Sequence, residues 1–124
     1  MGQSMTKKLP LPKLIKKAEK VFNAWIRQRD KDKGCISCGN QIDHAGHYFS
    51  AGHYSGLRFN ESNVHGQCAA CNVFKHGNLI EYGIGLVNRY GTTFHIELLN
   101  KSKTHKLKKW DREELENIIK KYSQ

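Results

Sequence analysis

Apolar side chains recur at spacings of three and four residues over 13–32, and this periodicity predicts a long amphipathic helix. The preceding segment, 1–12, lacks the pattern and contains Pro10 and Pro12, so we expect a flexible basic arm there. Gly34 is the expected stop of the helix. The apolar face of the helix consists of Leu14, Ala18, Val21, Phe22, Trp25 and Ile26.

The chain after residue 78 also carries apolar residues at helical spacing. A helix is expected over 78–90, although Gly83 and Gly85 oppose it because glycine has a low helix propensity. Thr92 or Thr93 is expected to cap a short segment that ends at Leu99.

A polar, basic connector is expected over 100–109, followed by a final helix. Asp111 is the expected N-cap of that helix, because aspartate accepts hydrogen bonds from first-turn amides. The apolar face of the final helix consists of Leu115, Ile118, Ile119 and Tyr122.

Two Cys-x-x-Cys pairs bound the most informative stretch of the chain. The pairs are Cys35 with Cys38 and Cys68 with Cys71, and four thiolates in a tetrahedron form a closed structural zinc site. Two disulfides, or four buried thiols, are the alternatives. No signal peptide or apolar leader is recognised over 1–8, which argues against an oxidising compartment. We therefore expect zinc, and with it a large contribution to folding.

The loop between the two pairs has room for structure of its own. Short strands are expected over 45–50 and 63–67, and a helix over about 69–75. The fold class expected is α+β: a small zinc-stabilised ββα core over 34–78, flanked by the helix over 13–33 and a helical part over 79–124. The length of the chain fits a single domain over 13–124.

Charge narrows the class of partner. Lysine and arginine number 21 against 11 aspartate and glutamate residues, a formal charge of +10 that falls to about +8 with zinc on four thiolates. This excess favours a nucleic acid over a membrane, because no bilayer-spanning run or lipidation motif is present. An ordinary solvated helix face is the alternative to DNA contact for the basic stripe, which comprises Lys13, Lys16, Lys17, Lys20 and Arg27.

The motifs AGHY, RFNESNVHGQC, CNVFKHGN and EYGIGL, over about 34–91, resemble the phage NinG (Rap) recombination proteins and, more distantly, the HNH (ββα-metal, His-Me finger) nucleases. This resemblance implies a structure-specific endonuclease that acts on Holliday junctions, D-loops or flaps. It also implies a structural zinc ion, a separate catalytic Mg²⁺ or Mn²⁺, recombination proteins as partners, and a phage- or prophage-encoded protein in the bacterial cytoplasm.

The resemblance assigns roles to individual residues. His47 falls at the general base and Asn63 at the middle asparagine of the motif. Asn72, directly after the last cysteine, falls at a catalytic and metal-ligand position, and His76 matches a further ligand position. A neutral histidine can accept a proton from water, and an amide oxygen suits a hard divalent ion.

The sequence departs from the family pattern next to the base. Where HNH nucleases usually carry an aspartate or histidine ligand, this chain has Gly46, so Asp43 or His44 would have to supply that ligand. His53, in a second AGHY, is the alternative base.

Arg58 and Lys75 are candidates for phosphate contacts. Each site residue also has a structural alternative: Asn72 as a helix cap, His76 as a surface residue, and Asn63 as a turn former.

Two functions follow from these patterns. The first is a metal-dependent endonuclease for branched DNA, and the second is a zinc-stabilised DNA-binding or recombination accessory module that does not cut. A sequence-specific HNH nuclease is a weaker third alternative, because the length leaves no room for a separate reading domain. A homodimer would suit paired cuts in a junction of twofold character.

Overall fold

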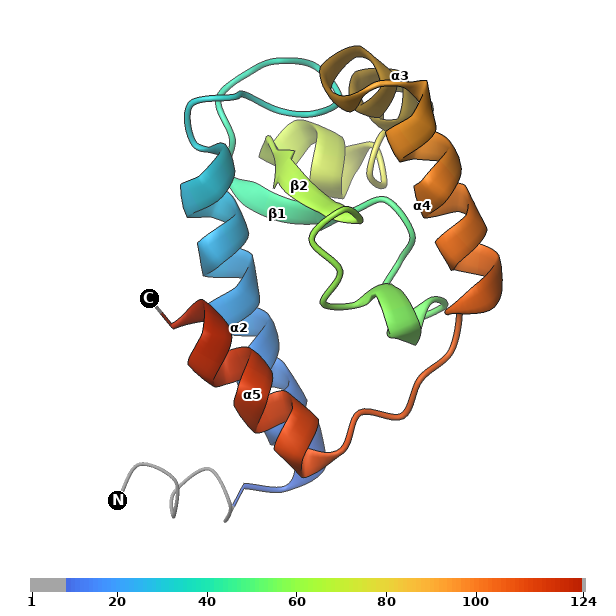
Figure 1. Ribbon diagram of the computed structural model, residues 1–124. Helices are drawn as coiled ribbons and strands as arrows, with labels where there is room; N and C mark the ends of the chain where they lie inside the picture. Colours follow the sequence, from blue (N-terminus) through green and yellow to red (C-terminus); the bar gives the residue numbers. More distant parts are fainter. Residues whose placement is uncertain (1–8, 124) are drawn as a thin grey trace.

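The computed structural model describes residues 9–123, so residues 1–8 of the expected arm lie outside the described part. Helices and a small antiparallel sheet together confirm the α+β class (Figure 1). In chain order the elements are α2 (Leu11–Asp30), β1 (His44–His47), η1 (Ser55–Leu57), β2 (Val64–Gln67), η2 (Ala70–Phe74), α3 (Leu79–Tyr90), α4 (Thr92–Thr104) and α5 (Arg112–Tyr122).

The first and last helices, α2 and α5, lie side by side (Figure 1). α2 begins at Leu11, two residues earlier than expected, because Pro12 sits in the first turn, where a backbone N–H has no helical partner to lose. Phe22 packs edge-on against Tyr122, with the ring centroids 4.8 Å apart. The core of this layer contains Leu14, Ala18, Phe22, Ile26, Phe59, Val64, Leu115 and Tyr122.

The predicted N-cap of the final helix is confirmed. The Asp111 carboxylate accepts from the Glu114 backbone N–H at 2.8 Å, and the Glu114 carboxylate accepts from the Asp111 backbone N–H. This reciprocal pair forms a capping box, which satisfies two amides that the helix leaves without partners.

Strands β1 and β2 pair antiparallel, with His44 opposite Gln67 and His47 opposite Val64. β1 was expected over 45–50 but ends at His47. The Asn63 side chain explains the early end of the strand. Its amide forms hydrogen bonds with both the N–H and the carbonyl oxygen of Phe49, in place of the backbone groups of a paired strand.

Helices α3 and α4 cover the other side of the sheet, around a second core of Ile36, Leu57, Tyr82, Leu86 and Leu98.

The predicted end and the predicted cap of the segment after Gly91 were both wrong. α4 continues through 100–104, which we expected to be a connector, and buries Ser102 beyond Leu98. Gly91, with φ of 94°, is the N-cap in place of a threonine side chain.

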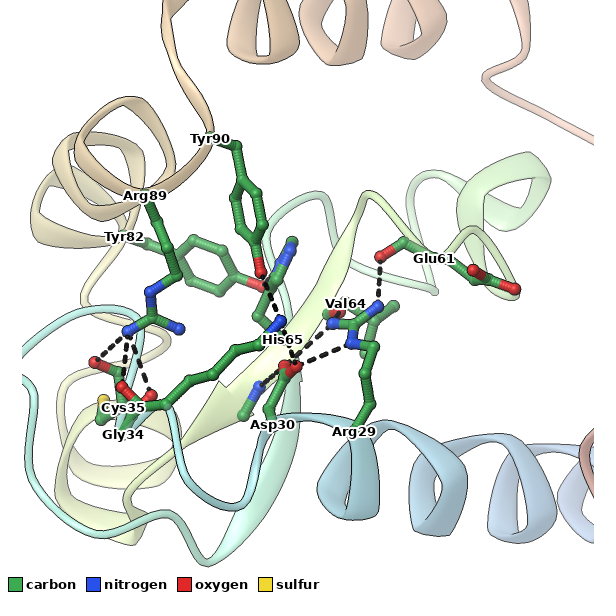
Figure 2. A network of polar contacts seen from close by, with 12 residues as sticks. Arg29, Asp30, Gly34, Cys35, Glu61, Val64, His65, Tyr82, Arg89 and Tyr90 are labelled. Carbon is green, nitrogen blue, oxygen red and sulfur yellow. Dashed lines mark hydrogen bonds and ion pairs between the residues drawn. The ribbon is translucent and has the colours of Figure 1, made fainter. Parts of the chain in front are cut away.

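A buried ion pair joins α2 to the sheet (Figure 2). The Asp30 side chain is fully buried; it accepts from Arg29 Nε at 2.7 Å and from the backbone N–H of Gly66 in β2 at 2.9 Å. Arg29 also donates to the carbonyl oxygens of Glu61 and Val64. This network fixes the end of α2 against the strand that leads to the second cysteine pair.

None of the described helices has the length and apolar content that crossing a bilayer requires.

Candidate functional site

The four cysteines converge from two separate turns. Their sulfur atoms all lie within 4.8 Å of one another, and Cys38 Sγ is 3.6 Å from Cys68 Sγ. Four sulfurs bound tetrahedrally to zinc at about 2.3 Å would be about 3.8 Å apart. All four are free thiols, so the disulfide alternative does not hold in this structure. The cluster could therefore hold a structural metal ion, as the cysteine spacing predicts.

Backbone amides favour an anionic sulfur at Cys35. Burial raises the pKa of the Cys35 thiol, but hydrogen bonds from the backbone amides of Cys68, Cys38 and Ser37 outweigh it and lower the pKa to about 7. The backbone N–H of Cys71 also donates to Cys68 Sγ at 3.4 Å. Since metals bind the thiolate form, these donors favour coordination through Cys35. The Asn40 amide lowers the pKa of Cys38, but burial and the hydrogen bonds with the other three thiols outweigh it and raise that pKa to about 12, so metal binding must displace the Cys38 proton.

His47 lies at the end of β1. Its Nε2 is 3.0 Å from the carbonyl oxygen of Arg58, and that oxygen can only accept, so Nε2 carries the proton and Nδ1 has the lone pair. Burial lowers the pKa of His47, which keeps the ring neutral at pH 7. His47 lines an open surface pocket of about 370 Å³ together with Ser50, Tyr54 and His76.

Asn63 is fully buried between β1 and the loop that follows it. Its Oδ1 accepts from the Phe49 N–H at 2.8 Å, and its Nδ2 donates to the carbonyl oxygens of Phe49 and Leu57. The side chain therefore ties the loop that carries Arg58 to the strand that carries His47. These three hydrogen bonds are to backbone groups and not to the His47 imidazole.

Asn72 lies within the π-helical turn η2, so it does not have the capping role that was its structural alternative. Its Nδ2 is 3.2 Å from Nδ1 of His44. The hydrogen bonds thus bring His44, and not His47, into contact with Asn72. Side chains alternate along β1: His44 and Gly46 face η2, whereas Ala45 packs against the α2 and α5 core, on the face shared with His47.

The remaining candidates for the divalent ion and the base differ in their surroundings. The Asp43 carboxylate accepts from the Ala69 backbone N–H at 2.9 Å and so caps the turn of the second cysteine pair. His76 is exposed and has a left-handed backbone, with φ of 50°, which is uncommon outside glycine. His53 is exposed, and its Nδ1 is 3.0 Å from Ser50 Oγ.

The predicted basic stripe is exposed along α2, at Lys13, Lys16, Lys17, Lys20 and Arg27. Lys75 is also exposed, on the turn after η2. Arg58 is different, because it is half-buried and forms an ion pair with Glu19 at 3.1 Å. Its guanidinium is thus already engaged beside His47.

Two residues of the site were missed by sequence reasoning. Tyr82, fully buried on α3, donates its hydroxyl to the carbonyl oxygen of Gly46 at 2.7 Å. Gln67, fully buried on β2, donates to the carbonyl oxygen of Gly77 at 2.7 Å. The periodicity of the sequence marks neither position, because both depend on which groups the fold places opposite them.

Comparison with known proteins finds one matching family. The family model described as "NinG: Bacteriophage Lambda NinG protein" matches residues 3–124. Curated relatives include Protein ninG of Escherichia phage 933W, 43% identical over 114 residues that cover 89% of this chain and 55% of the relative. Protein ninG of Salmonella phage P22 and of Escherichia phage lambda are each 42% identical over 114 residues, with 54% of the relative covered. The chain therefore spans about half the length of these relatives.

No solved structure matches the chain.

Proposed function

We propose, from the premise that this chain belongs to the NinG family of bacteriophage proteins, that it is a metal-dependent endonuclease of the HNH type. Its substrates would be branched recombination intermediates: Holliday junctions, D-loops or flaps. The motifs suggest the reaction, and the surroundings of His47 support it.

The observation that carries the proposal is the state of the His47 ring. A general base for water must be neutral near pH 7 and must present a lone pair. Burial lowers the pKa of His47, and the Arg58 carbonyl holds the proton on Nε2, so Nδ1 is the atom that can accept a proton. His47 also lines an open pocket with His76, which gives a substrate a place to enter.

The residues present fit the two metal roles differently. Four converging thiols are a donor set that zinc prefers, so we assign the structural ion as zinc, held by Cys35, Cys38, Cys68 and Cys71. Asn72 and His76 would hold the catalytic Mg²⁺ or Mn²⁺, whose chemistry is to stabilise negative charge on the phosphate. Asp43 is a weaker candidate ligand, because its carboxylate already caps Ala69.

The surrounding residues would position the reacting groups. Asn63 fixes the loop whose Arg58 carbonyl orients His47, so it would act on the base indirectly. Lys75, exposed one turn after Asn72, would contact a phosphate.

A non-catalytic DNA-binding module is the second candidate function. The observation that favours it is the partner of Asn72, whose amide contacts His44 and not the proposed base. In that reading the neutral His47 is a packed structural residue of the hairpin, and the exposed lysines of α2 carry the binding.

An assay for nicking separates the two. Purified zinc-loaded protein is incubated with a labelled four-way junction, a flap and a linear duplex, with Mg²⁺ or Mn²⁺. Under the nuclease proposal the branched substrates are cut, and His47→Ala lowers the rate by at least about 100-fold. Zinc content and junction binding should persist in that variant.

His53→Ala is the matched control, since His53 is the corresponding residue of the second AGHY and is exposed. It should retain cutting. Loss of cutting in His53→Ala with retention in His47→Ala would move the base to His53. Absence of cutting on all substrates with either ion would leave the binding module as the function.

A further inference from the structure

The space beside Gly46 on the η2 face of β1 contains two amide oxygens. A Cβ built on Gly46 would lie 1.9 Å from Oε1 of Gln67 and 3.0 Å from Oδ1 of Asn72. A methyl group at position 46 would collide with the Gln67 amide and force that side chain to shift. The glycine is thus what allows Gln67 Oε1 to approach the strand.

The orientation of the Gln67 amide is fixed by its other end. Nε2 donates to the Gly77 carbonyl oxygen at 2.7 Å and to Ser37 Oγ at 2.9 Å. Because a carbonyl oxygen can only accept, the amide cannot be turned over, and Oε1 must point towards Gly46. Gln67 is fully buried, yet Oε1 accepts no hydrogen bond from the described residues.

An unpaired buried carbonyl oxygen is costly, by about 1–3 kcal/mol, so it requires a reason. Asn72 suggests one, because the contact of its Nδ2 with His44 leaves Oδ1 directed at the same space. Two neutral amide oxygens that converge beside a strand are ligands for a hard divalent cation.

We propose that Gln67 Oε1 joins Asn72 Oδ1 as a protein ligand in the binding site for Mg²⁺ or Mn²⁺. Gln67 would then supply, from β2, the oxygen that Gly46 cannot supply from β1. This inference rests on the proposed function for its role in catalysis, but the binding of the cation can be measured without DNA.

Neutral ligands imply weak binding by the protein alone. Mg²⁺ sites of this kind are completed by water and by substrate phosphates, so we expect a dissociation constant in the millimolar range without DNA. The probe is therefore Mn²⁺, whose paramagnetism broadens nearby amide resonances in the zinc-loaded protein. Broadening should centre on Gly46, Gln67 and Asn72.

Charge variants make the test quantitative. Asn72→Asp replaces one proposed ligand with a carboxylate and should tighten Mn²⁺ binding at this site by about tenfold or more. Asn88→Asp adds the same charge at an exposed position of α3 and should leave the affinity of the site unchanged. Equal effects of the two variants would overturn the proposal.

A variant at Gln67 tests whether its oxygen is a ligand. Gln67→Met removes both polar atoms and should abolish site-specific broadening. If Gln67→Met does not fold, Gly46→Ala is the alternative, because its methyl group displaces Oε1. Unchanged broadening in a folded Gln67→Met or Gly46→Ala variant would refute the role of Gln67.

The outcomes for the two proposals are distinguishable. Site-specific Mn²⁺ binding without any DNA cutting would retain this site and refute the nuclease. If His47→Ala abolishes cutting but the Gln67 variant binds Mn²⁺ as tightly as the unchanged protein does, the nuclease proposal stands and Gln67 is not a ligand.

Discussion

The carboxylate of Asp30, the last residue of α2, accepts a hydrogen bond of 2.9 Å from the backbone N–H of Gly66 in the middle of β2. Asp30 and Arg29 lie in one network of polar contacts (Figure 2). Burial raises the pKa of Asp30, but the hydrogen bonds from Arg29 and Gly66 outweigh it, and the pKa lies below its usual value. Asp30 is therefore charged in the folded protein and connects the helix to the strand that precedes Cys68.

Replacing Asp30 should destabilise the whole domain. Asp30→Ala leaves the Arg29 guanidinium and the Gly66 amide without their buried acceptor, and we expect a loss of about 3–5 kcal/mol in the free energy of unfolding. Denaturant unfolding followed by circular dichroism measures this. Asp32→Ala is the control, since it removes the same charge from an exposed site two residues away and should cost less than about 0.5 kcal/mol.

Removal of metal should unfold the protein. If the four sulfurs bind zinc, the ion joins the turn after α2 to the turn after β2, so its binding energy contributes directly to folding. We expect one zinc per chain by atomic absorption, and loss of the helical circular dichroism signal when a strong chelator is added. Chelator saturated with zinc beforehand is the control and should have no effect. A fold that survives complete removal of metal would contradict a structural role for the cluster.

His65 should make stability depend on pH. It is buried, its pKa is lowered to about 3, chiefly by burial and then by the charge of Arg29, and its Nδ1 is 3.2 Å from the Tyr82 hydroxyl. Well above pH 6.5 the His65 ring is neutral in both the folded and the unfolded protein, so it does not change the free energy of unfolding with pH. As the pH falls below 6.5, the unfolded chain binds a proton that the folded protein does not, so stability is lost.

The expected loss from His65 is about 2 kcal/mol between pH 6.5 and pH 5. His65→Phe keeps an aromatic ring beside Tyr90 and removes the titration, so its stability should fall less over the same range. The measurement is denaturant unfolding at each pH with saturating zinc. Parallel curves for the two proteins would mean that other groups account for the acid sensitivity.

The basic stripe of α2 should set the salt dependence of DNA binding. Each phosphate contact made by a lysine steepens the plot of log affinity against log salt by about 0.9. Changing Lys13, Lys16, Lys17 and Lys20 together to alanine should therefore flatten the slope by up to about 3–4. The control changes four exposed lysines elsewhere, Lys101, Lys103, Lys109 and Lys120, and removes the same net charge. If the two variants flatten the slope equally, DNA does not bind preferentially along α2.

The sequence was most informative where chemistry demands a local spacing. A metal cluster needs two close cysteines on each turn, so Cys35, Cys38, Cys68 and Cys71 were predicted from spacing alone, and the Asp111 cap followed from the preference of aspartate for the N-cap position. The family was also predicted correctly from the motifs. The nuclease activity and its residues stay predictions.

The parts that could not be predicted depend on contacts between distant segments. The end of β1 depends on the amide of Asn63, and the convergence of Gln67 and Asn72 depends on the missing side chain of Gly46. Helix propensity counts Gly85 as unfavourable for α3, but it contains no information about the segments that pack against the helix. It therefore could not show that a neighbouring segment needs the space at Gly85. In the structure that neighbour is the turn of the first cysteine pair.

Gly85 should therefore be required for the approach of α3 to the metal cluster. A Cβ at Gly85 would lie 1.9 Å from the carbonyl oxygen of Ile36, a backbone atom between Cys35 and Cys38. Gly85→Ala gains up to about 1 kcal/mol in helix propensity, but the clash should cost more, giving a net destabilisation of about 1–3 kcal/mol and faster zinc release.

Gly83→Ala is the matched control in the same helix. Its Cβ would meet the Tyr48 hydroxyl at 2.9 Å, a side-chain atom and not a backbone atom of the cysteine turn, so the substitution should cost less than Gly85→Ala and leave zinc release unchanged. Thermal unfolding and the rate of zinc transfer to a chromogenic chelator measure both effects. A Gly85→Ala variant that is stabilised, or that holds zinc as well as Gly83→Ala does, would show that α3 can move away from the cysteine turn without loosening the cluster.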